Sequence, residues 1–230
     1  MSAYKKVGIL VADDVEYFPL IEAAAKYNPK EERKLGMLCH RFTLENGIEV
    51  LSVYTGIGKV AAAAGAALLI QNNCEAVFNF GFSGAISRVK KGELVLGTGF
   101  FEHDFDLTPI GYAPCQKRKN CDPVLKADEF LLGEFKKHFA GIFEGVFATG
   151  DCFVSNCALR DKLRDNYGAI ACDMETAAVS DVCKMAGIPF VSLRQISDDA
   201  GDSAADIYRE TVSVSDVSMS LATLKVLKGL

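Results

Sequence analysis

One stretch of the sequence decides the fold class: residues 48–85, IEVLSVYTGIGKVAAAAGAALLIQNNCEAVFNFGFSGA. It opens with an apolar run of strand length over 48–54. A glycine turn then leads into small residues over 59–71 with the pattern of a helix. A second apolar run over 76–80 predicts another buried strand. Strand, helix and strand in this order are typical of α/β proteins.

The same alternation continues along the chain. Asn46-Gly47 separates apolar runs over 37–44 and 48–54, which predicts a β-hairpin because a type I′ turn needs positive φ twice. Further strands are predicted over 5–12, 93–101, 145–149, 169–172 and 188–196, and further helices over 16–27, 130–139, 159–167, 176–186 and from Ala204 to the C-terminus. We therefore predict a single α/β domain over residues 1–230, with three α/β/α layers around a central twisted mixed β-sheet.

Residues 102–127 form the longest stretch without a helix or strand pattern. The stretch contains several prolines and the basic run Lys117-Arg118-Lys119. A loop this long inside a compact domain is usually functional or part of an interface. We interpret the basic run as a solvated loop tip.

Composition excludes several classes of protein. Half of the 230 residues are hydrophobic and 24% are charged, which is ordinary for a globular chain and excludes disorder as the main state. The net charge of -5 disfavours binding to nucleic acid, which needs a basic face. No apolar run reaches the ~18 residues that span a bilayer, and the apolar segment before Asp13 is too short for a signal peptide. We therefore expect a cytoplasmic protein without a membrane partner.

Neither the cysteines nor the histidines form a metal motif. No two of the eight cysteines have the two-residue spacing of a zinc or thioredoxin-like site, and the three histidines are scattered. We expect reduced structural thiols and no metal.

Three glycine turns follow predicted strands. Gly56-Ile57-Gly58-Lys59-Val60-Ala61 imitates a dinucleotide fingerprint, but no acidic residue closes the following strand at 76–80, so nicotinamide or flavin binding is disfavoured. In the segments 79–85 and 150–156, a predicted strand likewise runs into a turn that contains glycine. Ligands of α/β sheets bind outside the carboxyl ends of the strands, so each is either a plain tight turn or a ligand-lining turn.

Carboxylates gather at three predicted strand ends. They lie in Asp13-Asp14-Val15-Glu16, in Asp173-Met174-Glu175 and in Ser197-Asp198-Asp199. Carboxylates aimed into one cleft are what acid–base chemistry requires. Glu16 and Glu175 also open predicted helices, where an acidic residue is common for helix stability alone.

These segments occur together and in order, and the chain as a whole resembles the nucleoside phosphorylase/nucleosidase family. It is most similar to the 5′-methylthioadenosine/S-adenosylhomocysteine nucleosidases, over about residues 5–228. The resemblance implies the phosphorylase/hydrolase-like fold and hydrolysis of the N-glycosidic bond of an adenine nucleoside. It also implies a homodimer without a metal or organic cofactor.

The resemblance implies roles for individual residues. Asp198 matches the acid that protonates adenine N7 with Ser197 orienting it, and Glu16 matches the base that activates water. Arg194 is expected to help hold the water, and the backbone of Phe82 faces it. The remaining substrate contacts are expected from Glu175 on the ribose hydroxyls, Met174 on the sugar, Phe153 stacked on the base, the backbone of Val154 at its edge, and Ile57 and Gly84 in the glycine turns.

The chain departs from the family pattern at several positions. Asp173 stands where Glu is common, Phe82 where Ser or Thr is common, and Cys152 where Ala is usual. Ile110 and Pro114 are the nearest matches to apolar residues that cover the neighbouring subunit's site in relatives.

Three alternatives to this reading remain. They are a phosphorylase, a hydrolase for another purine nucleoside such as a futalosine, and a non-catalytic nucleoside-binding protein. Asn79 occupies the position of an arginine in the similar hexameric phosphorylases, which disfavours phosphate as a substrate.

Overall fold

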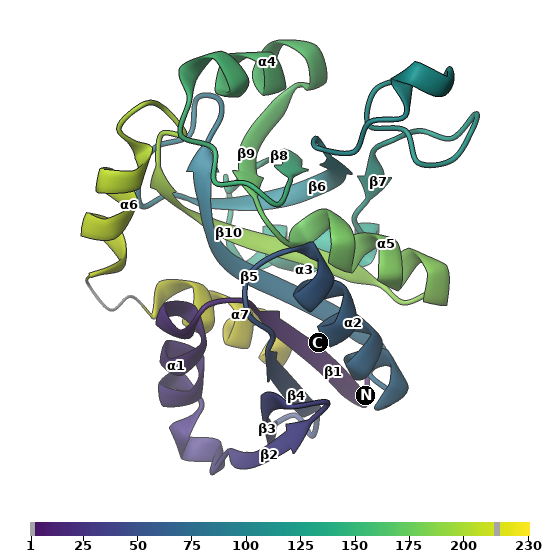
Figure 1. Cartoon of the computed structure of the whole chain (residues 1–230). Coiled ribbons are helices and arrows are strands. Elements are labelled where there is room, and N and C mark those ends of the chain that lie inside the picture. Colours follow the sequence, from purple (N-terminus) through teal and green to yellow (C-terminus); the bar gives the residue numbers. More distant parts are fainter. Residues whose placement is uncertain (1–2, 214–216) are drawn as a thin grey trace.

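The computed structural model describes residues 3–213 and 217–230, and Figure 1 shows the course of the chain. The strands are β1 Lys6–Val11, β2 Lys30–Lys34, β3 Met37–Thr43, β4 Glu49–Tyr54, β5 Ala76–Ala85, β6 Leu94–Glu102, β7 Leu125–Lys126, β8 Phe143–Thr149, β9 Ala169–Asp173 and β10 Phe190–Asp198. The α-helices are α1 Asp14–Ala23, α2 Lys59–Gln71, α3 Glu129–His138, α4 Cys157–Tyr167, α5 Thr176–Ala186, α6 Ala204–Val212 and α7 Ser218–Gly229. Two short 3₁₀ helices, Ala25–Tyr27 and Thr108–Ile110, complete the list.

The strands form one mixed sheet that closes on itself at one end. Strand β5 pairs with β1, with β9 and with β10, and the ring continues from β10 through β6 and β8 back to β9. Strands β4, β3 and β2 extend the sheet beyond β1 as an open wing. The predicted α/β fold with a central mixed sheet is confirmed, whereas closure of the ring was not predicted.

Helices cover both faces of this sheet. Helices α2 and α5 pack side by side on one face, and α7 packs with α1 and α3 on the other (Figure 1). Helix α6 lies against β10, and α4 lies against β9. The long segment after β6 projects from the body and returns as β7 (Figure 1).

Two sequence predictions were wrong in detail, and one strand at the sheet edge was not predicted. The glycine segment 81–84 is part of β5 rather than a turn, because pairing with β9 and β10 extends the strand. Strand β2 has the sequence KEERK without an apolar alternation, and it forms by pairing with β3 at the sheet edge, where charged side chains remain in solvent. The predicted C-terminal helix is two helices, since α6 ends at Val212, where β-branched residues and serine are poor helix formers.

Strands β5 and β10 are buried along their whole length, yet both carry polar residues. The buried polar residues are Asn79 and Ser83 on β5, and Ser192, Arg194, Gln195, Ser197 and Asp198 on β10. Burying such groups costs free energy unless they are paired, so their concentration on adjacent strands points to a functional site. Within the described ranges, no helix is long and apolar enough to cross a membrane.

Candidate active site

A cavity of about 150 Å³ opens at the carboxyl ends of β1, β4, β5, β8, β9 and β10. This is the edge at which α/β sheets bind ligands. Ten of the site residues expected from the sequence line it: Glu16, Ile57, Phe82, Gly84, Phe153, Val154, Met174, Glu175, Ser197 and Asp198. The fold thereby brings together residues as far apart in the sequence as Glu16 and Asp198.

Glu16 is held in the first turn of α1 by two backbone donors. Phe82 N–H donates to Glu16 Oε1 at 2.6 Å, and Asp13 N–H donates to Oε2 at 3.3 Å. Burial raises the pKa of Glu16 to about 8, although the Arg194 guanidinium opposes this rise. A Cβ atom at Gly81 would lie 2.5 Å from Arg194 Nη1 and 2.8 Å from Glu16 Oε1, so only glycine lets these charges approach β5.

Asp198 occupies a separate wall of the same cavity. Ser197 Oγ donates to Asp198 Oδ2 at 2.7 Å, and Ala200 N–H donates to Oδ1 at 2.9 Å. Burial outweighs both bonds and raises the pKa of Asp198. Gly84 again provides the space, since a Cβ atom there would lie 3.0 Å from Asp198 Oδ1.

The glycine turn after β4 forms a hydrogen bond with the Glu175 side chain. Gly58 has a φ of +100° and donates its N–H to Glu175 Oε1 at 3.0 Å. Burial raises the pKa of Glu175, and Arg194 opposes the rise. The turn that imitates a dinucleotide fingerprint therefore binds a carboxylate of its own chain.

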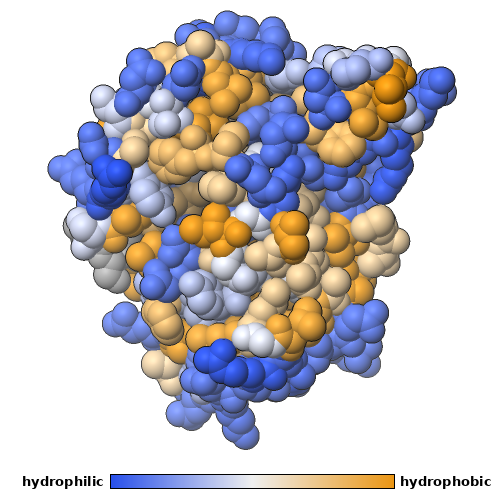
Figure 2. Space-filling model, viewed as in Figure 1, coloured by the Kyte–Doolittle hydropathy of each residue, from blue (hydrophilic) through white to orange (hydrophobic). Residues whose placement is uncertain are grey.

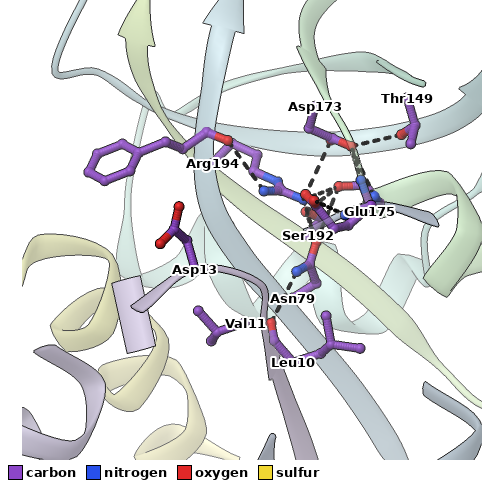
Figure 3. A network of polar contacts seen from close by, with 12 residues as sticks. Leu10, Val11, Asp13, Asn79, Thr149, Asp173, Glu175, Ser192 and Arg194 are labelled. Atoms are coloured by element: carbon purple, nitrogen blue, oxygen red, sulfur yellow. Dashed lines mark hydrogen bonds and ion pairs between the residues drawn. The ribbon is translucent and has the colours of Figure 1, made fainter. Parts of the chain in front are cut away.

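Arg194 is the central cation beneath the cavity and is 1% exposed. Its Nη2 donates to Asn79 Oδ1 at 2.8 Å and to Thr176 Oγ1 at 2.6 Å (Figure 3). The same nitrogen lies 3.6 Å from a carboxylate oxygen of Asp173 and 3.6 Å from one of Glu175. Arg194 is thus fixed by neutral acceptors and compensates a group of buried carboxylates.

Asp173 has a structural role at the start of α5. Its Oδ1 accepts hydrogen bonds from Thr149 Oγ1 at 2.8 Å, from Glu175 N–H at 3.0 Å and from Thr176 N–H at 2.9 Å (Figure 3). The short aspartate side chain satisfies donors that the first turn of the helix leaves open. This contact accounts for an Asp at a position where relatives commonly have Glu.

Asp13 and Asp173, which belong to the predicted carboxylate clusters but were assigned no role, also line the cavity. Five further lining residues were not predicted as site residues: Ala12, Ser83, Cys152, Cys172 and Tyr208. The Tyr208 ring packs edge-on against Phe153 at 5.5 Å and against Phe82 at 6.5 Å between ring centroids. Tyr208 lies on α6, ten residues beyond Asp198, and no sequence motif marks it. Only the packing of α6 against β10 brings it to the cavity.

The long loop does not reach the cavity of its own chain. Ile110 is 70% exposed, and Pro114 is also exposed. The interpretation of the basic run as a solvated tip was partly wrong, because Lys117 forms ion pairs with Glu102 and Asp181, and Arg118 pairs with Asp181 at 3.4 Å. No group of three or more potential metal ligands occurs in the described part of the chain.

The family follows from comparison with known proteins. The model of the phosphorylase superfamily matches residues 6–227. The chain belongs to the phosphorylase superfamily. Its 5′-methylthioadenosine/S-adenosylhomocysteine nucleosidase relative from Actinobacillus succinogenes is 34% identical over 214 residues, which cover 89% of this chain and 90% of that protein.

Solved structures of superfamily members resemble the chain over almost its full length. A 5′-methylthioadenosine/S-adenosylhomocysteine nucleosidase from Helicobacter pylori superimposes with a TM-score of 0.92 at 26% identity, covering 99% of both chains. The futalosine hydrolase of Helicobacter pylori superimposes with a TM-score of 0.89 at 26% identity, covering 97% of both chains. Members with different nucleoside substrates therefore share this fold.

Proposed function

We propose that this superfamily member hydrolyses the N-glycosidic bond of 5′-methylthioadenosine and S-adenosylhomocysteine, releasing adenine and a 5′-substituted ribose. The observation that carries the proposal is the placement of Glu16 and Asp198, two buried carboxyl groups with raised pKa values, on separate walls of one cavity. Glu175 is a third buried carboxyl group of the same cavity. This is an arrangement for acid–base catalysis at a sugar.

Asp198 acts as the general acid. Cleavage develops positive charge on the ribose and negative charge on the base, and adenine is a poor leaving group as an anion. Because burial favours the protonated carboxyl group, Asp198 delivers its proton to adenine N7 as the bond breaks. Ser197 Oγ fixes the orientation of the carboxyl group.

Glu16 acts as the general base toward water. Its two backbone contacts restrict the carboxylate, and the positive charge of Arg194 favours the ionised form. Because burial still raises the pKa to about 8, the fraction of ionised base increases as the pH rises toward that value. Water attacks C1′ of the ribose and gives one proton to Glu16, while adenine leaves with the proton from Asp198. The products are neutral adenine and the free 5′-substituted ribose.

Substrate binding uses the other lining residues. Phe153 is 43% exposed at the cavity and offers a ring face for adenine, with the backbone of Val154 at the edge of the base. Glu175 accepts hydrogen bonds from the ribose hydroxyls, and Met174 lies against the sugar. Gly84 leaves room for the base beside Asp198, and Ile57 adds an apolar contact.

The enzyme works as a cytoplasmic homodimer in methionine salvage, without cofactor or metal. Support for the dimer comes from exposed apolar residues, including Ile57 at the cavity, Val60 at the start of α2, which is 83% exposed, and Met185 in the last turn of α5. Figure 2 shows apolar residues gathered over α2, on the face that also carries α5. The loop with Ile110 and Pro114 would then cover the partner's 5′-substituent pocket.

Product analysis in phosphate-free buffer tests the reaction. The enzyme is incubated with 5′-methylthioadenosine, S-adenosylhomocysteine, 5′-deoxyadenosine, inosine and futalosine, and free base and sugar are quantified. We expect adenine and free 5-methylthioribose at full rate, since Asn79, bonded to Arg194, stands where a phosphate-binding arginine would be needed. A requirement for phosphate, or base release from futalosine alone, would overturn the proposal.

A further inference from the structure

Asp13 and Tyr208 line the cavity but have no part in the proposed reaction. Asp13 lies in the connection between β1 and α1, and Tyr208 lies on α6. Tyr208 Oη donates to Asp13 Oδ2 at 3.4 Å, and Asp13 N–H contacts Glu16. These contacts place Asp13 beside the proposed base Glu16, whereas the acid Asp198 is enclosed by Ser197, Gly84 and Ala200.

The proposed binding mode determines which part of the nucleoside meets Asp13. The base is assigned to the wall with Asp198 and Phe153, and the ribose hydroxyls are assigned to Glu175. The C4′–C5′ bond lies across the sugar ring from the base, so it points toward the cavity residues that remain. Ala12, Asp13 and Tyr208, with Ile57 at the turn after β4, are among those residues and lie on the side of Glu16.

A carboxylate in this place favours particular 5′ groups. A carboxylate can accept about four hydrogen bonds, and that of Asp13 accepts a long contact from Tyr208 and capping contacts from backbone N–H groups in the first turn of α1, which leaves part of this capacity open. A hydroxyl or ammonium group supplies a charge-assisted hydrogen bond. An apolar group displaces water from the carboxylate without replacing its hydrogen bonds, and an anionic group is repelled.

We propose that Asp13 is a specificity-determining residue that selects nucleosides whose 5′ substituent carries a hydrogen-bond donor, above all a cationic one. The inference rests on the proposed function and concerns which nucleosides the enzyme prefers in that reaction. Burial and the neighbouring Asp14 raise the pKa of Asp13, so a cationic partner would relieve an unfavourable buried charge.

Helix capping offers a simpler reason for an acceptor at this position, since Asp13 is the N-cap residue of α1. Asn and Ser cap helices about as well as Asp, so capping needs an acceptor but no charge. Asp13→Asn and Asp13→Ser therefore keep the cap and remove the charge. Glu22→Gln is the matched control, because Glu22 carries the same charge on the same helix, is exposed and does not line the cavity.

The experiment compares 5′-amino-5′-deoxyadenosine with 5′-methylthioadenosine at pH 7, where the amine is protonated. The kcat/KM for adenine release and the calorimetric affinity are measured for the wild type and the three variants. We expect the amino-to-methylthio ratio to fall at least about tenfold in Asp13→Asn and Asp13→Ser, and to stay within twofold in Glu22→Gln.

The outcomes separate the two proposals. An unchanged ratio in both Asp13 variants would overturn the role of Asp13 while leaving hydrolysis intact. If no nucleoside releases adenine, hydrolysis is overturned, and the ratio of the two affinities still decides the role of Asp13. An equal fall of the ratio in Glu22→Gln would show a general effect of surface charge and would also overturn the role of Asp13.

Discussion

Phe82 donates its backbone N–H to Glu16 Oε1 at 2.6 Å, across 66 positions of sequence. The donor belongs to the main chain, so it does not depend on the side chain at position 82. The Phe82 carbonyl oxygen accepts from Arg194 Nη1 at 3.3 Å, which ties the same peptide segment to the central cation. A phenylalanine where relatives carry a hydroxyl side chain thus leaves Glu16 fully supported, and its ring packs against Tyr208 instead.

Asp198→Asn is expected to lower kcat for 5′-methylthioadenosine by ~10²–10⁴-fold, the usual loss when a general acid is removed. The amide keeps the shape of the side chain and can still bond to Ser197, but it cannot protonate N7. Calorimetry with a non-hydrolysable substrate analogue serves as the control and should give wild-type affinity. Turnover within threefold of the wild type would remove Asp198 from the mechanism.

Phe153→Ala is expected to weaken adenine-nucleoside binding by roughly 5–150-fold, because stacking of a base on an aromatic ring contributes ~1–3 kcal/mol. The control is Phe143→Ala, which removes a comparably exposed ring at the opposite end of β8. Titration calorimetry measures both affinities. If both variants bind like the wild type, adenine does not stack on Phe153.

Glu16→Gln is expected to change how stability depends on pH. The pKa of Glu16 rises from 4.5 to about 8 on folding, so the folded state holds the proton more tightly than the unfolded state. Below pH 4.5 the protonated Glu16 makes its full contribution to the free energy of unfolding. This contribution is lost as the pH rises through about 8. The Tm of the variant relative to the wild type should therefore increase from pH 5 to about pH 8 and level off above it. Glu22→Gln, exposed on the same helix, should show no such trend.

Ile110→Asp is expected to weaken the proposed dimer by about tenfold or more and to raise KM for 5′-methylthioadenosine. Replacing an apolar interface residue with a charged one costs at least ~1 kcal/mol of binding free energy when the partner buries that residue well. Leu35→Asp is the control, since Leu35 is 74% exposed at the turn between β2 and β3. Sedimentation over a concentration series measures the dimer. A fully active wild-type monomer at micromolar concentration would contradict the shared site.

The order of helices and strands could be predicted because it depends on local patterns. Apolar runs and helical spacing placed eight of the ten strands, among them β1, β4 and β5, within a few residues. The two-residue β7 fell inside the stretch interpreted as irregular, and β2 was also missed. The missed β2 carries no apolar pattern, since backbone pairing with β3 forms it.

The sequence by itself determined the α/β class, the glycine positions and the carboxylates at the strand ends, because spacing along the chain fixes which residues follow a strand. Only the tertiary structure decided that β5 pairs with both β9 and β10, that Asn79 holds Arg194, and that Tyr208 reaches Asp13. Asn79 and Arg194 are 115 positions apart in the sequence, and Asp13 and Tyr208 are 195 positions apart. Such contacts arise when packing of the whole chain buries the sheet, and no local pattern encodes which distant side chains then share one cavity.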